Sequence, residues 1–168
     1  ITSTSSGPLT ISGGVSGLGN ISLSSAGAIS ALANLTAVGL NSVSVGGANY
    51  SGANHFTNVT SLTNTGSGNV VFNNTAAPLT IAKMTNTGGN ITVDNVGKVV
   101  ISGEMNATGT LSVTAHSPLT VASTGSVTAA GNLSLVAAST SAASTIDLLT
   151  IDGPVLSSAG NIALFGGS

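Results

Sequence analysis

The sequence predicts an all-β chain that folds as a single-stranded parallel β-helix, in other words a β-solenoid. Three observations predict this fold class. Short triplets with apolar first and third residues recur along the chain, turn-forming residues separate them, and both recur together in a unit of about 20 to 22 residues. A single repeat domain is expected to cover residues 1–168.

The triplets alternate between apolar and small residues with the period of two that is typical of β-strands. In chain order they are Leu9-Thr10-Ile11, Ile21-Ser22-Leu23, Val43-Ser44-Val45, Val70-Val71-Phe72, Leu79-Thr80-Ile81, Ile91-Thr92-Val93, Val99-Val100-Ile101, Leu111-Ser112-Val113, Leu119-Thr120-Val121, Leu133-Ser134-Leu135 and Ile162-Ala163-Leu164. Gly, Asn, Ser and Pro lie between the triplets and favour turns. Ala-rich residues 26–40 and 133–143 are interrupted by Ser, Thr, Asn or Gly, which disfavours a helix.

Two series of strand openings set the length of the repeat. The first recurs after 21, 20 and 22 residues. Its members are Gly68-Asn69-Val70, Gly89-Asn90-Ile91, Gly109-Thr110-Leu111 and Gly131-Asn132-Leu133. The second series, Pro78-Leu79-Thr80-Ile81 and Pro118-Leu119-Thr120-Val121, is spaced by 40 residues, or two units. Related openings occur at Pro8-Leu9, Gly19-Asn20 and Gly160-Asn161, but the phase slips within residues 26–57 and 137–151, where we expect longer corner loops.

A unit of this size cannot bury its apolar face alone, so successive units are expected to stack as the coils of a solenoid around an aliphatic core. Gly and Asn would then form the tight or left-handed corners, and stacked Asn and Thr would hydrogen-bond from coil to coil. The expected turn and ladder residues are Asn64, Asn69, Asn86 and Asn90. Because the spacing is irregular outside the repeat, a β-sandwich is the alternative fold.

Composition narrows the classes of function. Only 4% of the 168 residues are charged, but 41% are hydrophobic and the mean hydropathy is +0.51, which favours a folded chain over a disordered one. Two Lys, no Arg and a net charge of -2 disfavour nucleic acid as a partner. No apolar run has the length of a membrane helix, so the chain is not expected to span a membrane. Without Cys there can be no thiolate metal site and no disulfide.

The patterns "GNISL", "GNITV", "GNLSL" and "GNIAL", in a chain rich in Ser, Thr, Asn, Gly and Ala, resemble the repeat region of filamentous-haemagglutinin-type exoproteins. These are large adhesins that Gram-negative bacteria export by two-partner secretion. The resemblance covers nearly the whole chain, although the family's secretion-domain signature is not evident. It implies a right-handed β-helix in an extracellular or cell-surface fibre for attachment, aggregation or biofilm cohesion, with surface glycans or host and matrix components as partners.

The distribution of charge bears on whether the ends of the solenoid are capped or are covered by further coils. Residues 1–82 contain no Asp, Glu, Lys or Arg, and neither end of the sequence shows a charged or helical cap. We therefore expect the chain to be a segment of a longer protein, or to associate with other copies end to end or laterally. A pilus-like filament subunit that assembles by strand donation is the alternative.

The ionisable residues do not predict an enzyme. Asp94 and Glu104 lie half a repeat apart and are expected on different faces, which disfavours the carboxylate pair of a polysaccharide hydrolase or lyase. His55 and His116 are 61 positions apart, so a shared zinc would require their coils to align. The calcium-binding nonapeptide is also absent. No catalytic residue, metal ligand or cofactor is predicted.

Two further patterns raise other possible functions. Eight Asn-x-Ser/Thr sequons are possible glycosylation sites, although turn Asn before a strand hydroxyl would produce the same pattern by chance. They are Asn20, Asn34, Asn49, Asn58, Asn73, Asn90, Asn106 and Asn132. Thr-x-Thr occurs at Thr2/Thr4, Thr63/Thr65 and Thr85/Thr87, and a regular Thr array on a flat solenoid face would suggest binding to ice or a polysaccharide.

Overall fold

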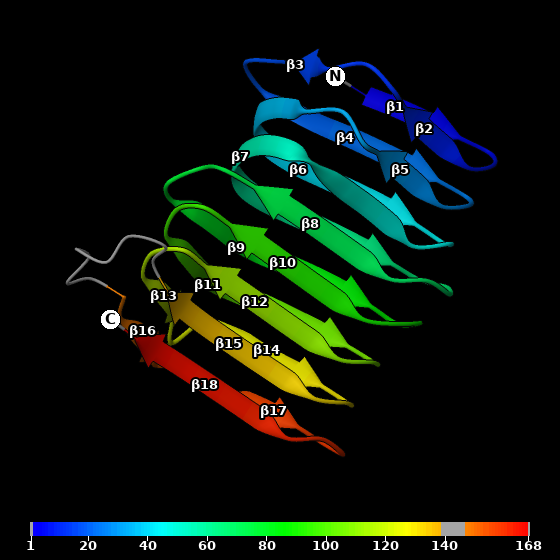
Figure 1. Cartoon of the computed structure of the whole chain (residues 1–168). Helices are drawn as coiled ribbons and strands as arrows, with labels where there is room; N and C mark the ends of the chain where they lie inside the picture. Colours follow the sequence, from blue (N-terminus) through cyan, green and yellow to red (C-terminus); the bar gives the residue numbers. More distant parts are fainter. Residues whose placement is uncertain (1, 139–146, 168) are drawn as a thin grey trace.

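The computed structural model describes residues 2–138 and 147–167 and confirms a parallel β-solenoid (Figure 1). Each strand pairs with a strand of the neighbouring coil, and every pairing among the described residues is parallel. The antiparallel β-sandwich is therefore excluded. The strands are β1 (Thr2–Ser5), β2 (Leu9–Ile11), β3 (Val15–Ser16), β4 (Asn20–Ser25), β5 (Ile29–Ala31), β6 (Leu35–Ser44), β7 (Ala48–Asn64), β8 (Val70–Asn74), β9 (Leu79–Asn86), β10 (Ile91–Asn95), β11 (Val99–Ala107), β12 (Leu111–Ala115), β13 (Leu119–Val121), β14 (Ser126–Ala129), β15 (Leu133–Ala138), β16 (Leu149–Ile151), β17 (Val155–Ser157) and β18 (Ile162–Gly167).

One ladder of strands confirms the predicted repeat. It runs in the order β2, β5, β7, β8, β10, β12, β15 and β18. Within it Val70 pairs with Ile91, Ile91 with Leu111, and Leu111 with Leu133. These are the apolar residues that follow the first series of openings, so the sequence spacing is the number of residues in one full coil.

The remaining strands form two more ladders. Leu79, Val99 and Leu119 stack on one another, which places the second predicted series in one column. Met84 and Met105 stack in a third column. A single coil thus contributes three short strand segments, and β9 and β11 each supply two of them by continuing through a bend.

The core is built from the inward residues of the triplets. In β10 and β12, for example, Ile91, Val93, Leu111 and Val113 are buried, while the residues between them face outward. Removing these aliphatic side chains from water is the main contribution to stability, because each coil covers its neighbour along the stack.

The three buried aromatic side chains lie together within this core. The ring centroids of Tyr50 and Phe72 are 6.0 Å apart, and those of Phe56 and Phe72 are 6.1 Å apart. Each of these ring pairs contributes about 0.5 to 1.5 kcal/mol beyond its buried area. The coils that contain β7 and β8 therefore pack larger side chains in the core than the later coils, whose described residues bury no aromatic side chain.

Glycine is required where the corners of successive coils meet. Gly68 has a φ of 94°, and a Cβ on it would lie 2.5 Å from the carbonyl oxygen of Gly46. Gly89 lies one coil further, and a Cβ there would meet the carbonyl oxygen of Gly68 at 2.5 Å. The Gly of the Gly-Asn openings is therefore explained by close backbone stacking. No described Asn has a positive φ, so Asn contributes through its side chain instead.

The expectation of a longer loop within residues 26–57 was wrong. Strands β6 and β7 continue through the corners there, and bulges absorb the slip of phase. The triplet Val43-Ser44-Val45 is also inverted: Ser44 is buried, whereas Val43 and Val45 are exposed. Most of the second slip, at residues 139–146, lies outside the described residues.

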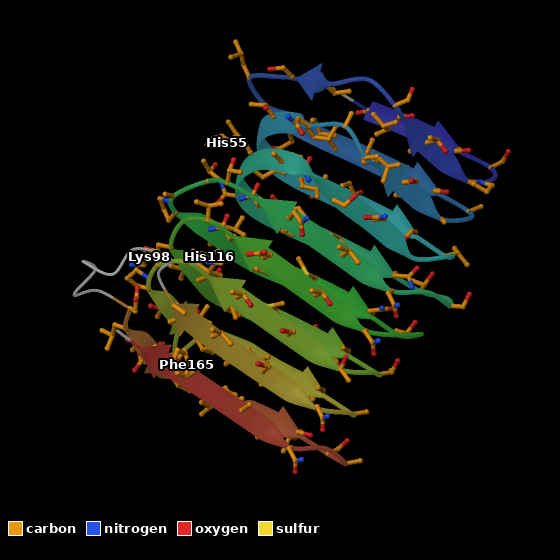
Figure 2. The ribbon with its side chains drawn as sticks, in the orientation of Figure 1. His55, Lys98, His116 and Phe165 are labelled. Carbon is orange, nitrogen blue, oxygen red and sulfur yellow. The ribbon has the colours of Figure 1, made fainter. Side chains whose placement is uncertain are left out.

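The last coil exposes an apolar edge. Ile162 and Leu164 stack on the buried Leu133 and Leu135, yet they are 45% and 51% exposed because no further coil covers them in this structure. Phe165, labelled in Figure 2 on the same strand, points to the outer face and is 55% exposed. Among residues 2–138 and 147–167, no helix is long and apolar enough to cross a membrane.

Candidate functional site

A surface groove lies beside a bulge in β7. Tyr50 pairs with Phe72 and Asn54 pairs with Asn74. Between these two pairings β7 therefore contains two more residues than β8. The additional chain forms a bulge at residues 51–53 and leaves a groove of about 240 Å³ beneath it. The groove is lined by Ser51, Gly52, Ala53, Asn73, Asn74, Thr75, Asp94, Val96 and His116.

The bulge is held in place on both sides. The backbone N–H of Ala53 donates to Oδ1 of Asn34 on the preceding coil, at 2.9 Å. Nδ2 of Asn54 donates to the carbonyl oxygen of Gly52 at 3.1 Å. Gly52 approaches the preceding coil so closely that a Cβ on it would lie 2.6 Å from the carbonyl oxygen of Ala33. The groove is thus a fixed part of the fold.

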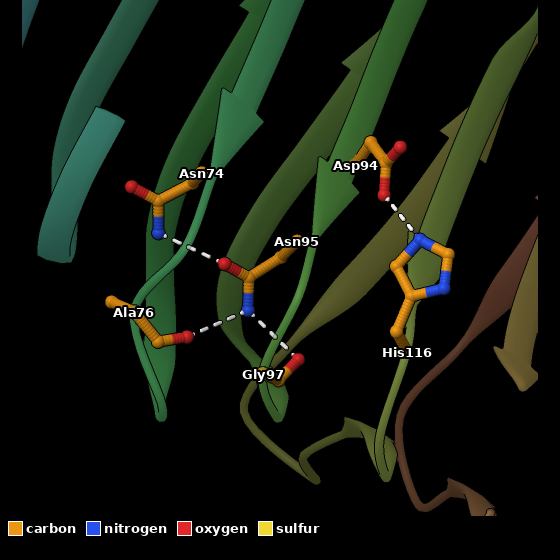
Figure 3. A network of polar contacts seen from close by, with 6 residues as sticks. All are labelled: Asn74, Ala76, Asp94, Asn95, Gly97 and His116. Carbon is orange, nitrogen blue, oxygen red and sulfur yellow. Dashed lines mark hydrogen bonds and ion pairs between the residues drawn. The ribbon is translucent and has the colours of Figure 1, made fainter. Parts of the chain in front are cut away.

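An imidazole–carboxylate pair forms one side of the groove. Nε2 of His116 lies 2.8 Å from Oδ1 of Asp94, which comes from the preceding coil (Figure 3). The side chains are 28% and 53% exposed, respectively. Within the part of the chain that the structure describes, it is the one place where a basic side chain lies within ion-pair distance of an acidic side chain.

A buried asparagine ladder lies directly behind this pair. Nδ2 of Asn74 donates to Oδ1 of Asn95 at 2.9 Å, and Nδ2 of Asn95 donates to the carbonyl oxygens of Ala76 at 2.9 Å and Gly97 at 2.8 Å (Figure 3). Asn74 and Asn95 are 2% and 0% exposed. Because these amides satisfy buried carbonyl groups at the corners, they fix the backbone that carries Asp94 and Thr75.

The structure places the four expected turn and ladder residues in two columns. Nδ2 of Asn64 donates to Oδ1 of Asn86 at 2.9 Å, and both residues are buried. On the surface, the N–H of Asn90 donates to Oδ1 of Asn69 at 3.0 Å. The side chain of the first residue in each pair thus contacts the next coil.

Sequence reasoning missed the Asn54, Asn74 and Asn95 column and the polar core around Tyr50. Asn54, Asn74 and Asn95 are spaced by 20 and 21 residues, so a search for Asn at the repeat length would have found them. The hydroxyl of Tyr50 lies 2.6 Å from Oγ of the buried Ser42. That contact joins two different ladders of the solenoid, and no sequence spacing indicates it.

The sequons differ in exposure. Exposed Asn occurs at Asn20, Asn34, Asn106 and Asn132, and half-buried Asn at Asn49, Asn58, Asn73 and Asn90. Several of these side chains contact the neighbouring coil; Oδ1 of Asn132, for example, accepts a hydrogen bond from the N–H of Asn161 at 3.0 Å. Their glycosylation stays a prediction.

The other candidate residues do not converge on a reaction centre. Asp94 lies in β10, whereas Glu104 lies in β11 and pairs in register with Lys83. His55 and His116 follow Asn54 and Ala115, which are three coil steps apart. Within residues 2–138 and 147–167, no group of three or more His, Cys, Asp or Glu could hold a metal ion.

One residue of each threonine pair lies in the same outward column, namely Thr4, Thr63 and Thr85, but this column is not an uninterrupted threonine array. Oγ1 of Thr85 donates to Oγ1 of Thr63 at 3.3 Å, so these two coils are in phase. Val43 separates Thr63 from the earlier Ser24 and Thr4, and Asn106 follows Thr85. Near the start of this column, Thr2, Thr4, Ser22, Ser24, Asn41 and Ser61 contribute to a second groove of about 290 Å³.

Comparison of the chain with protein-family models, with curated proteins and with solved structures gave no match. The geometry of the solenoid and the chemistry of its surface are therefore the observations from which a function is inferred.

Proposed function

We propose that this chain is a structural shaft and adhesion element of a bacterial cell-surface or extracellular-matrix adhesin, secreted by the cell. Its role is to form part of an elongated fibre for attachment, aggregation or biofilm cohesion. The observation that supports the proposal is the continuous parallel ladder from β2 to β18, whose inward residues form one aliphatic core.

A ladder of this kind suits a mechanical role. Each coil hydrogen-bonds to the coil before and after it, so the force needed to separate two coils must break many backbone bonds together. The buried Asn64–Asn86 and Asn74–Asn95 contacts add side-chain bonds along the same direction. Such a stack can hold a binding region away from a cell surface without a catalytic centre of its own.

The surface of the stack supports association with further coils. The exposed edge at β18 has inward-facing Ile162 and Leu164, which match the alternation of the coils beneath them. Residues 1–82 contain no Asp, Glu, Lys or Arg, and their outer faces carry hydroxyls, amides and exposed aliphatic side chains such as Leu32 and Val43. We infer that copies or further repeats stack end to end at this edge and that uncharged faces permit lateral contact.

Antibodies raised against the purified chain, applied to the organism that produces it, test this proposal. We expect them to label intact cells or the surrounding matrix, and to reduce cell aggregation when added as monovalent fragments. The denatured intact mass of the labelled protein would show whether 15.9 kDa of solenoid is one part of a longer fibre. Labelling that requires permeabilised cells would contradict a surface role.

A further inference from the structure

We propose that the groove between residues 51–53 and the Asp94–His116 pair binds one neutral saccharide unit. This inference goes beyond the shaft function and does not depend on it, since a solenoid can bind a sugar whether or not it forms a fibre. The groove lies where β7 has two more residues than the paired segment of β8.

The polar groups of the groove suit a ligand that carries several hydroxyls. Oδ1 of Asp94 is engaged by His116, and the carboxylate is 53% exposed, so its remaining acceptor capacity faces solvent. The hydroxyl of Thr75 donates to the carbonyl oxygen of Asn54 at 2.8 Å, and its oxygen lies 3.3 Å from Nδ1 of His55, which leaves one further acceptor position on that oxygen. Ser51 and Asn73 add a hydroxyl and an amide. Adjacent sugar hydroxyls can donate to the carboxylate and accept from the second N–H of the Asn73 amide, whose first N–H donates to the carbonyl oxygen of Ser51 at 3.2 Å.

The same groove has an apolar side. Val96 is 60% exposed, and the exposed Ala53 lies on the bulge. A pyranose ring presents C–H groups on one face and hydroxyls at its edge, so it can pack on Val96 while its edge contacts Asp94 and His116. A ligand that is polar on every side would leave Val96 exposed to water, so its binding would lack the favourable free energy of burying this apolar side chain.

Charge and size narrow the ligand class. The lining residues, all within the described part of the chain, include Asp94 and no Lys, so an anionic ligand would meet a carboxylate without a dedicated cation. The volume of about 240 Å³ lies below the roughly 300 to 1,000 Å³ of typical drug-sized ligand pockets, which favours one sugar unit over an oligosaccharide.

The groove is organised before a ligand arrives. The bulge is tied to Asn34 and Asn54, and the floor carries the buried Asn74, which is bonded to Asn95. Binding therefore immobilises little additional chain. With no aromatic side chain in the lining, we expect weak binding, with dissociation constants on the order of millimolar.

The test is an NMR titration of the ¹⁵N-labelled chain with methyl α-glycosides of glucose, galactose and mannose. We expect at least one of them to shift the ring signals of His116 and the amides of residues 51–53 and 73–75 saturably, while the amides of residues 126–129, which lie outside the groove, change less. Asp94→Asn should weaken that binding at least about tenfold, because a charge-assisted hydrogen bond is lost. Asp152→Asn removes a carboxylate from an exposed position outside the groove and should leave the affinity unchanged.

Three outcomes would overturn the proposal. One is the absence of saturable shifts in the groove with every glycoside up to its solubility limit. Another is equal binding by the Asp94→Asn chain, provided that its unfolding curve matches that of the unmodified chain. The third is tighter binding of methyl β-glucuronide than of the neutral glycosides, which would indicate an anion site instead.

Discussion

The side-chain amide of Asn74 donates a hydrogen bond to Oδ1 of Asn95 across one coil, at 2.9 Å (Figure 3). Both residues are buried, and each also bonds to backbone groups: Asn74 to the N–H and carbonyl of Phe56, and Asn95 to the carbonyls of Ala76 and Gly97. The corner of a coil that ends in such an Asn is therefore held partly by hydrogen bonds to the neighbouring coil. This dependence makes the stack cooperative.

Asn95→Ala should lower the free energy of unfolding by about 2 to 3 kcal/mol, because it leaves the buried carbonyls of Ala76 and Gly97 without a donor. Urea unfolding followed by the fluorescence of Tyr50 measures it, since the chain has one Tyr and no Trp. Asn106→Ala, at an exposed position, is the control and should change stability by less than about 0.5 kcal/mol. Equal effects of the two substitutions would show that the ladder does not stabilise the stack.

Tyr50 should make stability depend on alkaline pH. Burial raises the pKa of its hydroxyl well above the ordinary value, and the hydrogen bond with Ser42 lowers that pKa by a smaller amount. The Tyr50 hydroxyl therefore ionises at a lower pH in the unfolded state than in the folded state. Its contribution to the free energy of unfolding is complete below a pH of about 10 and decreases as the pH rises further towards the folded-state pKa. A spectrophotometric titration should show tyrosinate near pH 10 in urea, but in the folded chain only at higher pH or on unfolding.

Tyr50→Phe separates this effect from other alkaline changes. The substitution leaves Oγ of the buried Ser42 without its partner and should cost about 1 kcal/mol at neutral pH. It should also flatten the fall in stability above pH 10, which circular dichroism can follow in the absence of the phenol. A Phe variant with the same alkaline loss as the unmodified chain would assign that loss to other groups.

Gly68→Ala should destabilise the solenoid by more than about 2 kcal/mol, because it combines a positive φ with a backbone obstacle. The added Cβ would lie 2.5 Å from the carbonyl oxygen of Gly46, which cannot move without shifting the preceding corner. Gly13→Ala is the matched control, since a Cβ there meets nothing within 4 Å. It should be neutral or stabilise by up to about 1 kcal/mol. Thermal unfolding of both variants provides the comparison, and similar midpoints would refute the close-stacking explanation.

Much of the fold could be predicted from the sequence because two periodic patterns, the spacing of the triplets and the alternation within each triplet, are both visible in it. The spacing of Val70, Ile91, Leu111 and Leu133 reports the perimeter of a coil, and the alternation within each triplet reports which side chains face the core. Both are local properties of the chain, so they can be read without knowledge of tertiary contacts.

The prediction failed where similar patterns occupy different positions. Ile21, after the opening Gly19-Asn20, stacks on Leu40, whose column continues through Val59 to Ile81 of the Pro-Leu-Thr-Ile series. Leu9, after Pro8, instead stacks on Ile29, in the ladder that the later Gly-Asn openings share. Both openings provide a turn followed by an alternating triplet, so nothing local assigns either one to a particular side of the coil.

The groove was not predictable for a related reason. It results from the difference in length between two paired strands, which places Asp94 and His116 near residues 51–53 from three coils. The sequence shows Asp94 and His116 22 positions apart, but that spacing becomes a contact only after the exact corner of each coil is known. Bulges are set by packing among neighbours and not by composition.

The exposed edge at β18 provides the test of association between coils. Leu164 pairs in register with the buried Leu135, so a further coil or a second copy would bury it, whereas Ala163 pairs with Ser134 and faces outward. We expect the unmodified chain to form larger oligomers with increasing concentration in sedimentation velocity. Leu164→Lys should weaken this association at least about tenfold, because burying an unpaired ammonium group costs several kcal/mol. Ala163→Lys adds the same charge on the same strand but should leave the stacking surface intact. A chain that sediments as a monomer at every concentration, or equal loss of association in both variants, would contradict end-to-end stacking at this edge.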